Sequence, residues 1–158
     1  MIKVTIIAVG KIKEKEFSAL ADEYIKRLSA FCDLKVIELK PEPLPESPNP
    51  AQIKSALLKE AGEILSKIPK DAQVFPLCIE GKQFSSEEFS KEIKICADNG
   101  KNICFLIGGS HGLDQSIKKN GIKVSFSAMT FPHKLFRIML LEQLYRGFSI
   151  INGGKYHK

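Results

Sequence analysis

The chain has 158 residues, 44% hydrophobic and 27% charged, which is the ordinary balance of one globular domain spanning residues 1–158. No apolar run approaches the roughly 18 residues of a membrane-spanning helix. Residues 1–9 read as a strand rather than a signal peptide, so we expect a cytoplasmic protein without a membrane partner. The net charge of +6 is concentrated in residues 115–158, where eight basic residues stand against one acid, Glu142. Such a localised field favours a phosphate-bearing partner, although a solvated surface is the ordinary alternative.

Patterns typical of strands and of helices alternate along the chain. The expected strands are residues 2–9, 34–39, 74–79, 103–107 and 124–127, with Gly81 ending the third. The expected helices are residues 14–28, 51–67, 85–99, 114–119 and 132–148. Five prolines between positions 41 and 50 predict an irregular loop. This alternation predicts a parallel sheet with helices on both faces, an α/β/α sandwich.

The last expected helix is apolar around almost its whole circumference. Its apolar residues are Leu135, Phe136, Ile138, Met139, Leu140, Leu141, Leu144, Tyr145 and Phe148. Because a small sheet covers only one face of a helix, the other face must be buried elsewhere. A second copy of the chain in a two-fold dimer explains this pattern, and burial under the proline-rich loop is the alternative. We therefore expect a homodimer.

Two turns that follow expected strands carry the candidate chemistry. In residues 107–113, Gly108 and Gly109 allow a ligand to approach the backbone, although a plain structural turn is an equal alternative. In residues 125–133, Thr130 and backbone groups suit the edge of an adenine, while Met129 and Phe131 provide apolar walls unless they are ordinary core residues. Because parallel strands end at one edge of a sheet, the turns predict a nucleotide-like pocket there.

Other site chemistries are disfavoured by the spacing of their residues. Cysteines stand at positions 32, 78, 96 and 104 without a CxxC pair, and we interpret them as buried thiols. His111 and His133 lack the spacing of metal ligands, so no metal is expected. Ser110 directly precedes His111 and the G-x-S-x-G motif is absent, which disfavours a hydrolase nucleophile.

The chain ends on Tyr156, His157 and Lys158. A frayed terminus is the ordinary interpretation of such an ending. An aromatic ring, an imidazole and an ammonium group together also suit stacking on a base and binding phosphate. The ending is therefore a candidate nucleic-acid contact beside the basic segment.

Several stretches of the chain resemble one known family in register. They are residues 7–11, 77–82, 106–109, 113, 125–133, 142–146 and 156–158. On these stretches the whole chain resembles the ribosomal RNA large subunit methyltransferase H family, which belongs to the SPOUT class of knotted methyltransferases. Two positions depart from the family pattern: Cys78 stands where an acid is usual, and Pro76 removes a donor within the third strand.

The resemblance implies a methyltransferase that uses S-adenosylmethionine as its methyl donor. The implied acceptor is N3 of a pseudouridine in helix 69 of 23S ribosomal RNA, within the assembled ribosome. The resemblance also implies a homodimer and a C-terminal trefoil knot, which patterns alone would not predict because knots are rare. The family's donor-binding positions fall on Leu77, Gly109, Ala128, Met129, Thr130, Phe131, Pro132 and His133.

The acceptor side is assigned from residue chemistry. We assign the catalytic group to His157, Tyr156 and Arg137: His157 or water takes the acceptor proton, and arginine steadies negative charge on the base. The expected RNA contacts are Lys118, Lys119, Arg146, Lys155 and Lys158. The competing function is a non-catalytic nucleotide- or RNA-binding protein associated with the ribosome, and a small hydrolase is a third hypothesis.

Overall fold

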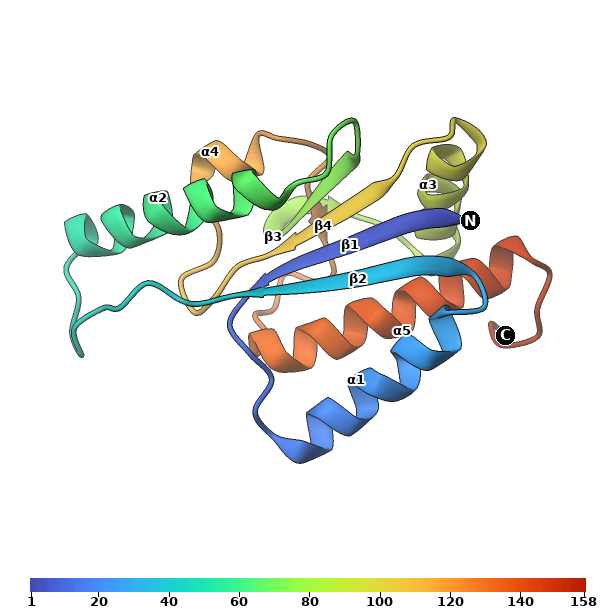
Figure 1. Cartoon of the computed structure of the whole chain (residues 1–158), viewed down its shortest axis with the longest axis horizontal. Coiled ribbons are helices and arrows are strands. Elements are labelled where there is room, and N and C mark those ends of the chain that lie inside the picture. Colours follow the sequence, from blue (N-terminus) through green and yellow to red (C-terminus); the bar gives the residue numbers. More distant parts are fainter.

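The computed structural model describes residues 1–158, which are built around a five-stranded sheet (Figure 1). The strands lie in the order β2-β1-β4-β3-β5, and every neighbouring pair runs parallel. The strands are β1 (Ile2–Val9), β2 (Cys32–Leu39), β3 (Gln73–Gln83), β4 (Ile103–Ile107) and β5 (Val124–Ser125). The helices are α1 (Lys15–Leu28), α2 (Pro50–Lys67), α3 (Ser86–Asp98), α4 (Gln115–Lys118) and α5 (His133–Ile151). The predicted parallel α/β architecture is confirmed.

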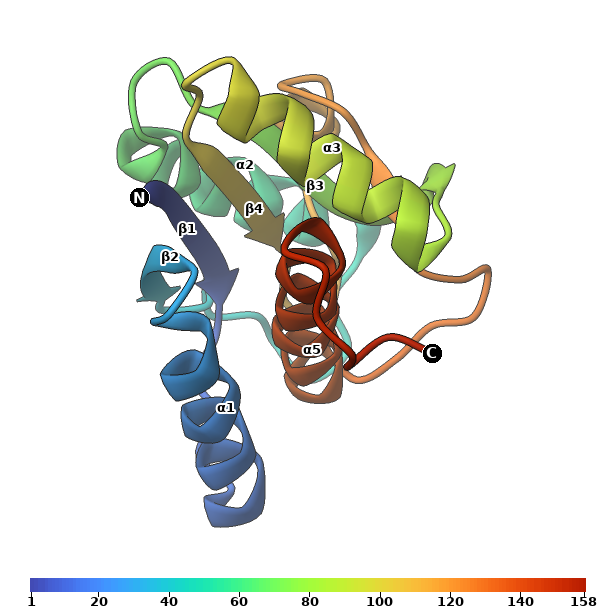
Figure 2. The same cartoon turned by 90° about the vertical axis from the view of Figure 1, so that its right-hand side faces the viewer.

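Helices cover both faces of the sheet. Helices α1, α3 and α5 pack on one face, and α2 and α4 pack on the other (Figure 1 and Figure 2). Because side chains alternate along a strand, Val4 and Ile6 of β1 join the core of the first face, whereas Ile7 joins the core of the second. Strand β4 is buried along its whole length, as its apolar sequence predicts for a central strand. None of the five helices combines the length and the apolarity that crossing a bilayer requires.

Two of the helices begin at capping boxes. The Asn49 side chain accepts a hydrogen bond from the Gln52 amide at 2.8 Å, and the Asn49 amide donates to the Gln52 side chain at 2.9 Å. Ser85 and Glu88 make the same exchange at the start of α3. Each box satisfies amide groups that have no partner within the helix. These caps confirm the predicted starts of both helices, and residues 40–49 before α2 form the predicted loop.

Strand β3 is longer than predicted, and Gly81 does not end it. Leu77 and Lys82 both pair with Val124 of β5, so the four residues between them bulge out of the ladder. A Cβ atom on Gly81 would lie 2.6 Å from the carbonyl carbon of Val124. Gly81 is therefore required because the backbones of β3 and β5 approach closely there, and it does not end the strand. Strand β5 is correspondingly short and ends at Ser125 instead of residue 127.

Helix α5 is flanked on two sides by helices of the same chain. It lies between α1 and α3 against the sheet, and it runs to Ile151, beyond the predicted end at residue 148 (Figure 2). The proline-rich loop does not cover it, because Pro41 and Leu44 line a small hollow with residues of α2. Much of the apolar circumference is thus explained within one chain. Leu135 remains 36% exposed, and Met139 is partly exposed.

The structure accounts for Pro76 and shows the surroundings of Cys78, the two unusual positions of the third strand. Pro76 pairs with Leu106 of β4, and β5 joins β3 only from Leu77 onward, so β3 is an edge strand at Pro76. Cys78 is partly exposed, which corrects the expectation of four buried thiols. The other three cysteines are buried, and burial raises the pKa of Cys104 to about 12.

Candidate functional site

A cavity of about 760 Å³ opens beyond the carboxyl end of β4 and beside the bulged middle of β3. The two turns that the sequence singled out meet in its wall, as expected for parallel strands that end at one edge. The predicted donor-binding residues that line it are Leu77, Gly109, Met129, Thr130, Phe131, Pro132 and His133. Ala128 is exposed and is not part of the lining. The volume falls within the range of about 300–1,000 Å³ that is typical of small-molecule sites.

The first turn folds back on itself without room for a side chain at Gly108. A Cβ atom there would lie 2.3 Å from the carbonyl carbon of Gly112. The Gly112 amide donates to the Gly109 carbonyl at 3.1 Å and closes the turn. The turn therefore presents backbone to the cavity, as the glycine pattern predicted, and its shape depends on the missing Cβ.

The second turn is held by its own serines. The Ser125 hydroxyl donates to the Ser127 carbonyl at 3.0 Å, and the Met129 amide donates to the Ser127 hydroxyl at 3.0 Å. The Met129 side chain is 73% exposed, so it is not an ordinary core residue. Phe131 is partly buried and lines the cavity. Apolar side chains and exposed backbone thus share one wall.

Two histidines lie at this site in different surroundings. His133 is half-buried where α5 begins, and burial, followed by the charges of Lys134 and Arg137, lowers its pKa. It is therefore neutral at pH 7, with one ring nitrogen able to donate a hydrogen bond and the other able to accept one. His111 is exposed, and its Nδ1 lies 3.2 Å from the Ser110 hydroxyl. No hydrogen bond orients its other ring nitrogen, as a hydrolase would require.

Arg137 is not brought to the cavity. It is buried, and its Nη1 lies 2.7 Å from Glu38 Oε2 and 3.3 Å from the Gly10 carbonyl oxygen. Burial opposes the ionisation of Glu38, but the hydrogen bonds from Arg137 and from the Ile12 amide, together with the positive charges of Arg137 and Lys11, outweigh it and lower the pKa of this carboxyl. The pair joins α5 to the end of β2. Its position indicates a structural contribution to this corner of the sheet.

The C-terminal residues are docked rather than frayed. Glu142 Oε1 accepts from the Tyr156 hydroxyl at 3.1 Å and from Arg146 Nη2 at 2.5 Å. His157 Nδ1 lies 3.1 Å from Arg146 Nη1, and its Nε2 lies 2.8 Å from Glu87 Oε1. We call residues 155–158 the tail, and its residues do not line the cavity.

The tail phenol is held in its protonated form. A hydrogen bond with the Tyr24 side chain, burial, and the neighbouring carboxylate of Glu142 together raise the pKa of Tyr156. The guanidinium of Arg146 also lies 4.8 Å from the centre of the Tyr156 ring. Tyr156 can therefore donate a hydrogen bond or stack, but it does not take up a proton at neutral pH.

The basic residues of the segment fall into two groups. Lys118 is paired with Glu80 and Arg146 with Glu142, so two of the predicted RNA contacts already have anionic partners. Lys119, Lys155 and Lys158 are exposed and have no ion partner. Free cations of this kind are the ones available to phosphate.

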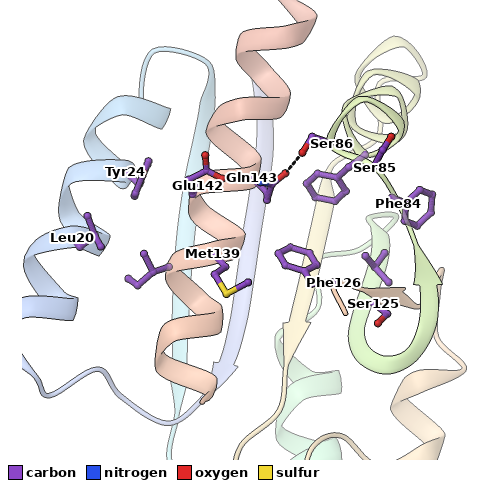
Figure 3. Close-up of a pocket in the computed structure, with 13 residues that line it drawn as sticks. Leu20, Tyr24, Phe84, Ser85, Ser86, Ser125, Phe126, Met139, Glu142 and Gln143 are labelled. Carbon is purple, nitrogen blue, oxygen red and sulfur yellow. Dashed lines mark hydrogen bonds between the residues drawn. The ribbon is translucent and has the colours of Figure 1, made fainter. Parts of the chain in front are cut away.

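A second hollow, a groove of about 490 Å³, runs over α5 between α1 and the start of α3 (Figure 3). Leu20 and Tyr24 form one side, and Met139 of α5 points into it (Figure 3). Its polar end is closed by the Ser86 hydroxyl, which donates to Gln143 Oε1 at 2.7 Å. The groove shares Ser125 and Phe126 with the cavity, so the two hollows adjoin.

Sequence reasoning missed the bulged segment of β3. Cys78, Ile79 and Glu80 all line the cavity, and Lys118 joins them from α4. The sequence of one strand that ends at a glycine does not predict a bulge. The bulge arises because Lys82 pairs with Val124 of β5, a residue about 40 positions further along the chain. No cluster of three or more histidine, cysteine or acidic side chains is arranged to hold a metal ion.

Comparison with known proteins gives matches along the whole chain. A family described as predicted SPOUT methyltransferase matches residues 2–157. The ribosomal RNA large subunit methyltransferase H of Clostridium botulinum (strain Alaska E43 / Type E3) is 48% identical, over 98% of this chain and 99% of that protein. The putative enzyme of the same name from Methanococcus maripaludis is 49% identical over the same shares of both chains. The enzyme of that name from Enterococcus faecalis is 44% identical over 99% of each chain.

Proposed function

Since the chain belongs to the SPOUT methyltransferases, in the ribosomal RNA large subunit methyltransferase H family, we propose that it methylates N3 of a pseudouridine in 23S ribosomal RNA. The proposed methyl donor is S-adenosylmethionine, and the proposed acceptor lies in helix 69 of the assembled ribosome. The observation that carries this proposal is the meeting of the two predicted turns in one cavity. An enzyme acting on assembled ribosomes would work in the cytoplasm.

The cavity suits a nucleoside donor in size and in lining. Leu77, Met129 and Phe131 offer apolar surface, and the turns around Gly109 and Thr130 offer backbone groups. A purine needs both, because its faces are apolar and its edge carries donors and acceptors. When bound, the donor supplies an electrophilic sulfonium methyl group. The protein mainly has to hold the acceptor in line, and such positioning can lower a barrier by roughly 7–11 kcal/mol.

We assign the acceptor side of the reaction to the tail. The acceptor nitrogen must lose a proton, and His157 carries an imidazole suited to receive it. Arg146 holds the imidazole by donating to its Nδ1, and Nε2 faces Glu87, so the contact with Arg146 must open before Nδ1 can receive the proton. The Arg146 guanidinium lies over one face of the Tyr156 ring, so a base would stack on the other face. Arg137 is ion-paired with Glu38 and does not line the cavity, so we leave it outside the reacting group.

A homodimer would bring the two sides together. Within one chain the tail residues do not line the cavity, whereas the groove adjoins it through Ser125 and Phe126. A second copy seated in the groove, on Leu20 and Met139, would lie next to the cavity and place its own tail there. The exposed cations Lys119, Lys155 and Lys158 would then contact RNA phosphates around the entrance.

One assay separates this function from its competitors. The protein is incubated with S-adenosylmethionine labelled in the methyl group and with ribosomes from a strain that lacks the modification. Label in 23S RNA at the helix 69 pseudouridine is the expected result. Binding of S-adenosylhomocysteine without any transfer would instead support a non-catalytic nucleotide- or RNA-binding protein. Ester hydrolysis without need for the donor would support the hydrolase hypothesis.

A further inference from the structure

The bulge in β3 carries the one acidic side chain of the cavity. Residues 78–81 leave the ladder because Leu77 and Lys82 both pair with Val124. Bulges of this kind re-aim side chains near binding sites. Here the result is that Cys78, Ile79 and Glu80 all line the cavity, and Glu80 is the only aspartate or glutamate that does so.

Lys118, which follows Ile117 in α4, holds this carboxylate. Its ammonium group forms an ion pair with Glu80 Oε1. The Lys118 side chain is only 14% exposed, whereas that of Glu80 is 46% exposed. The hydrogen bond from Lys118 lowers the pKa of Glu80, so the carboxyl is ionised at neutral pH. Its second oxygen, Oε2, has no hydrogen-bond partner within the chain and is free to accept one.

The chemistry of the Glu80 carboxylate, paired with Lys118, determines which groups of a ligand it can bind. An ionised carboxylate only accepts hydrogen bonds, so it matches a group with hydroxyl donors. It repels phosphate, which argues against a phosphodiester at this part of the rim. The hydroxyl side chains of Ser127 and Thr130 in the lining are uncharged and lack this preference. A nucleoside offers a pair of hydroxyl donors in its ribose, and a positively charged sulfonium on the same molecule adds attraction to the carboxylate.

We propose that Glu80 binds the ribose hydroxyls of the nucleoside methyl donor and that Lys118 orients its carboxylate. This inference rests on the proposed function, because it takes the donor as the occupant of the cavity. It gives Lys118 a positioning role at the donor in place of the phosphate contact expected from its charge. Glu80 is then a determinant of specificity for ribonucleosides over their deoxy analogues.

The test compares the binding of two ligands to two forms of the full-length protein, measured by calorimetry. S-Adenosylhomocysteine and its 2′,3′-dideoxy analogue are titrated into the wild-type protein and into Glu80→Gln. We expect the substitution to weaken S-adenosylhomocysteine binding about tenfold, in the range of a charge-assisted hydrogen bond. Removing the ligand hydroxyls should weaken wild-type binding by a similar factor, and Glu80→Gln should bind both ligands almost equally. The exposed Glu63 of α2 provides a matched control, Glu63→Gln, with unchanged affinity.

The outcomes against the inference are distinct. If Glu80→Gln still discriminates between the two ligands as strongly as the wild type, Glu80 does not contact the ribose and the inference is wrong. A loss of transfer rate at unchanged donor affinity would likewise contradict it. If the wild-type protein fails to bind S-adenosylhomocysteine at all, the proposed function itself is wrong and this inference falls with it.

Lys118 is tested by two measurements on Lys118→Met. A positioning role predicts a loss of roughly threefold to fivefold in S-adenosylhomocysteine affinity, smaller than that of Glu80→Gln, with little change in the salt dependence of RNA binding. Unchanged donor affinity, together with a salt slope reduced by about one, would identify a phosphate contact and overturn the positioning role. Circular dichroism during urea unfolding confirms that each variant remains folded.

Discussion

The cavity and the tail differ in what holds them in place. The cavity is shaped by backbone: the turn at Gly108, the serine-held turn at Ser127, and the bulge before Lys82. The tail is held by side-chain contacts of Glu142 and Glu87 with Tyr156, Arg146 and His157. Backbone geometry is fixed once the sheet has formed, whereas each of these side-chain contacts, partly open to solvent, contributes little by itself. The donor site is therefore rigid, whereas displacing the tail costs less free energy.

The strongest test of the rigid half is Gly108→Ala. The added Cβ would lie 2.3 Å from the Gly112 backbone, so the turn must rearrange. We expect a loss of about 3 kcal/mol in the free energy of unfolding and loss of detectable S-adenosylhomocysteine binding. Gly62→Ala is the matched control, because nothing lies within 4 Å of its Cβ position in α2, and it should stabilise by up to about 1 kcal/mol. Equal effects of the two substitutions in urea unfolding would contradict a backbone-built cavity.

The complementary test of the tail is His157→Gln. Removing the proton acceptor should lower the methylation rate about 10- to 100-fold, because water can partly replace it. Donor affinity should stay within about twofold, since the tail residues do not line the cavity of their own chain. Single-turnover kinetics measures the methylation rate, and calorimetry measures the donor affinity. An unchanged rate would remove His157 from the proposed mechanism.

A third test addresses the ion pair between Glu38 and Arg137. Glu38→Gln leaves a buried guanidinium without its carboxylate, and we expect a loss of about 1–3 kcal/mol in stability at pH 7. Because the pKa of Glu38 is lowered in the folded protein, its contribution is present above the ordinary carboxyl pKa and is lost as the pH falls through the folded value. The difference between wild type and variant in urea unfolding should therefore shrink at acidic pH. A difference that grew in acid would contradict this assignment.

The smallest expected effects come from the exposed cations. Each of Lys119→Gln and Lys155→Gln should reduce the slope of log affinity for RNA against log salt by about 0.7–0.9. Lys94 of α3 is already paired with Asp98 at 2.7 Å, so Lys94→Gln serves as the control and should leave the slope unchanged. The slopes are measured by filter binding at several salt concentrations. Equal slopes in all variants would place the RNA surface elsewhere.

Much of the fold follows from local patterns in the sequence. The apolar run at Ile103–Ile107, the start of a helix at residue 85 and the proline-rich loop each follow from local sequence, and all three were predicted correctly. Both turns of the cavity were also found, because glycine permits backbone conformations that other residues avoid, and serine and proline favour local turns. The knotted form of this fold class, in contrast, is established by membership of the SPOUT family rather than by periodicity.

What the sequence failed to predict depends on contacts between distant residues. The bulge that exposes Glu80 requires β5 to pair twice with β3, and the partner of Lys118 lies 38 positions away. The burial of Arg137 against Glu38 likewise joins two ends of the chain. The sequence does not distinguish among the eight basic residues of positions 115–158. In the structure, Lys118, Lys134, Arg137 and Arg146 are ion-paired, and the others have no acidic partner.

The shared wall of the two hollows has a thermodynamic consequence. Ser125 and Phe126 border both the groove and the cavity, so whatever packs into one restrains the residues that shape the other. If a second copy occupies the groove and favours the ligand-bound arrangement of these two residues, ligand binding must strengthen subunit association by the same factor. Occupancy of the pocket and assembly of the pair would then be one linked equilibrium, in which a saturated protein dissociates less readily on dilution than an empty one.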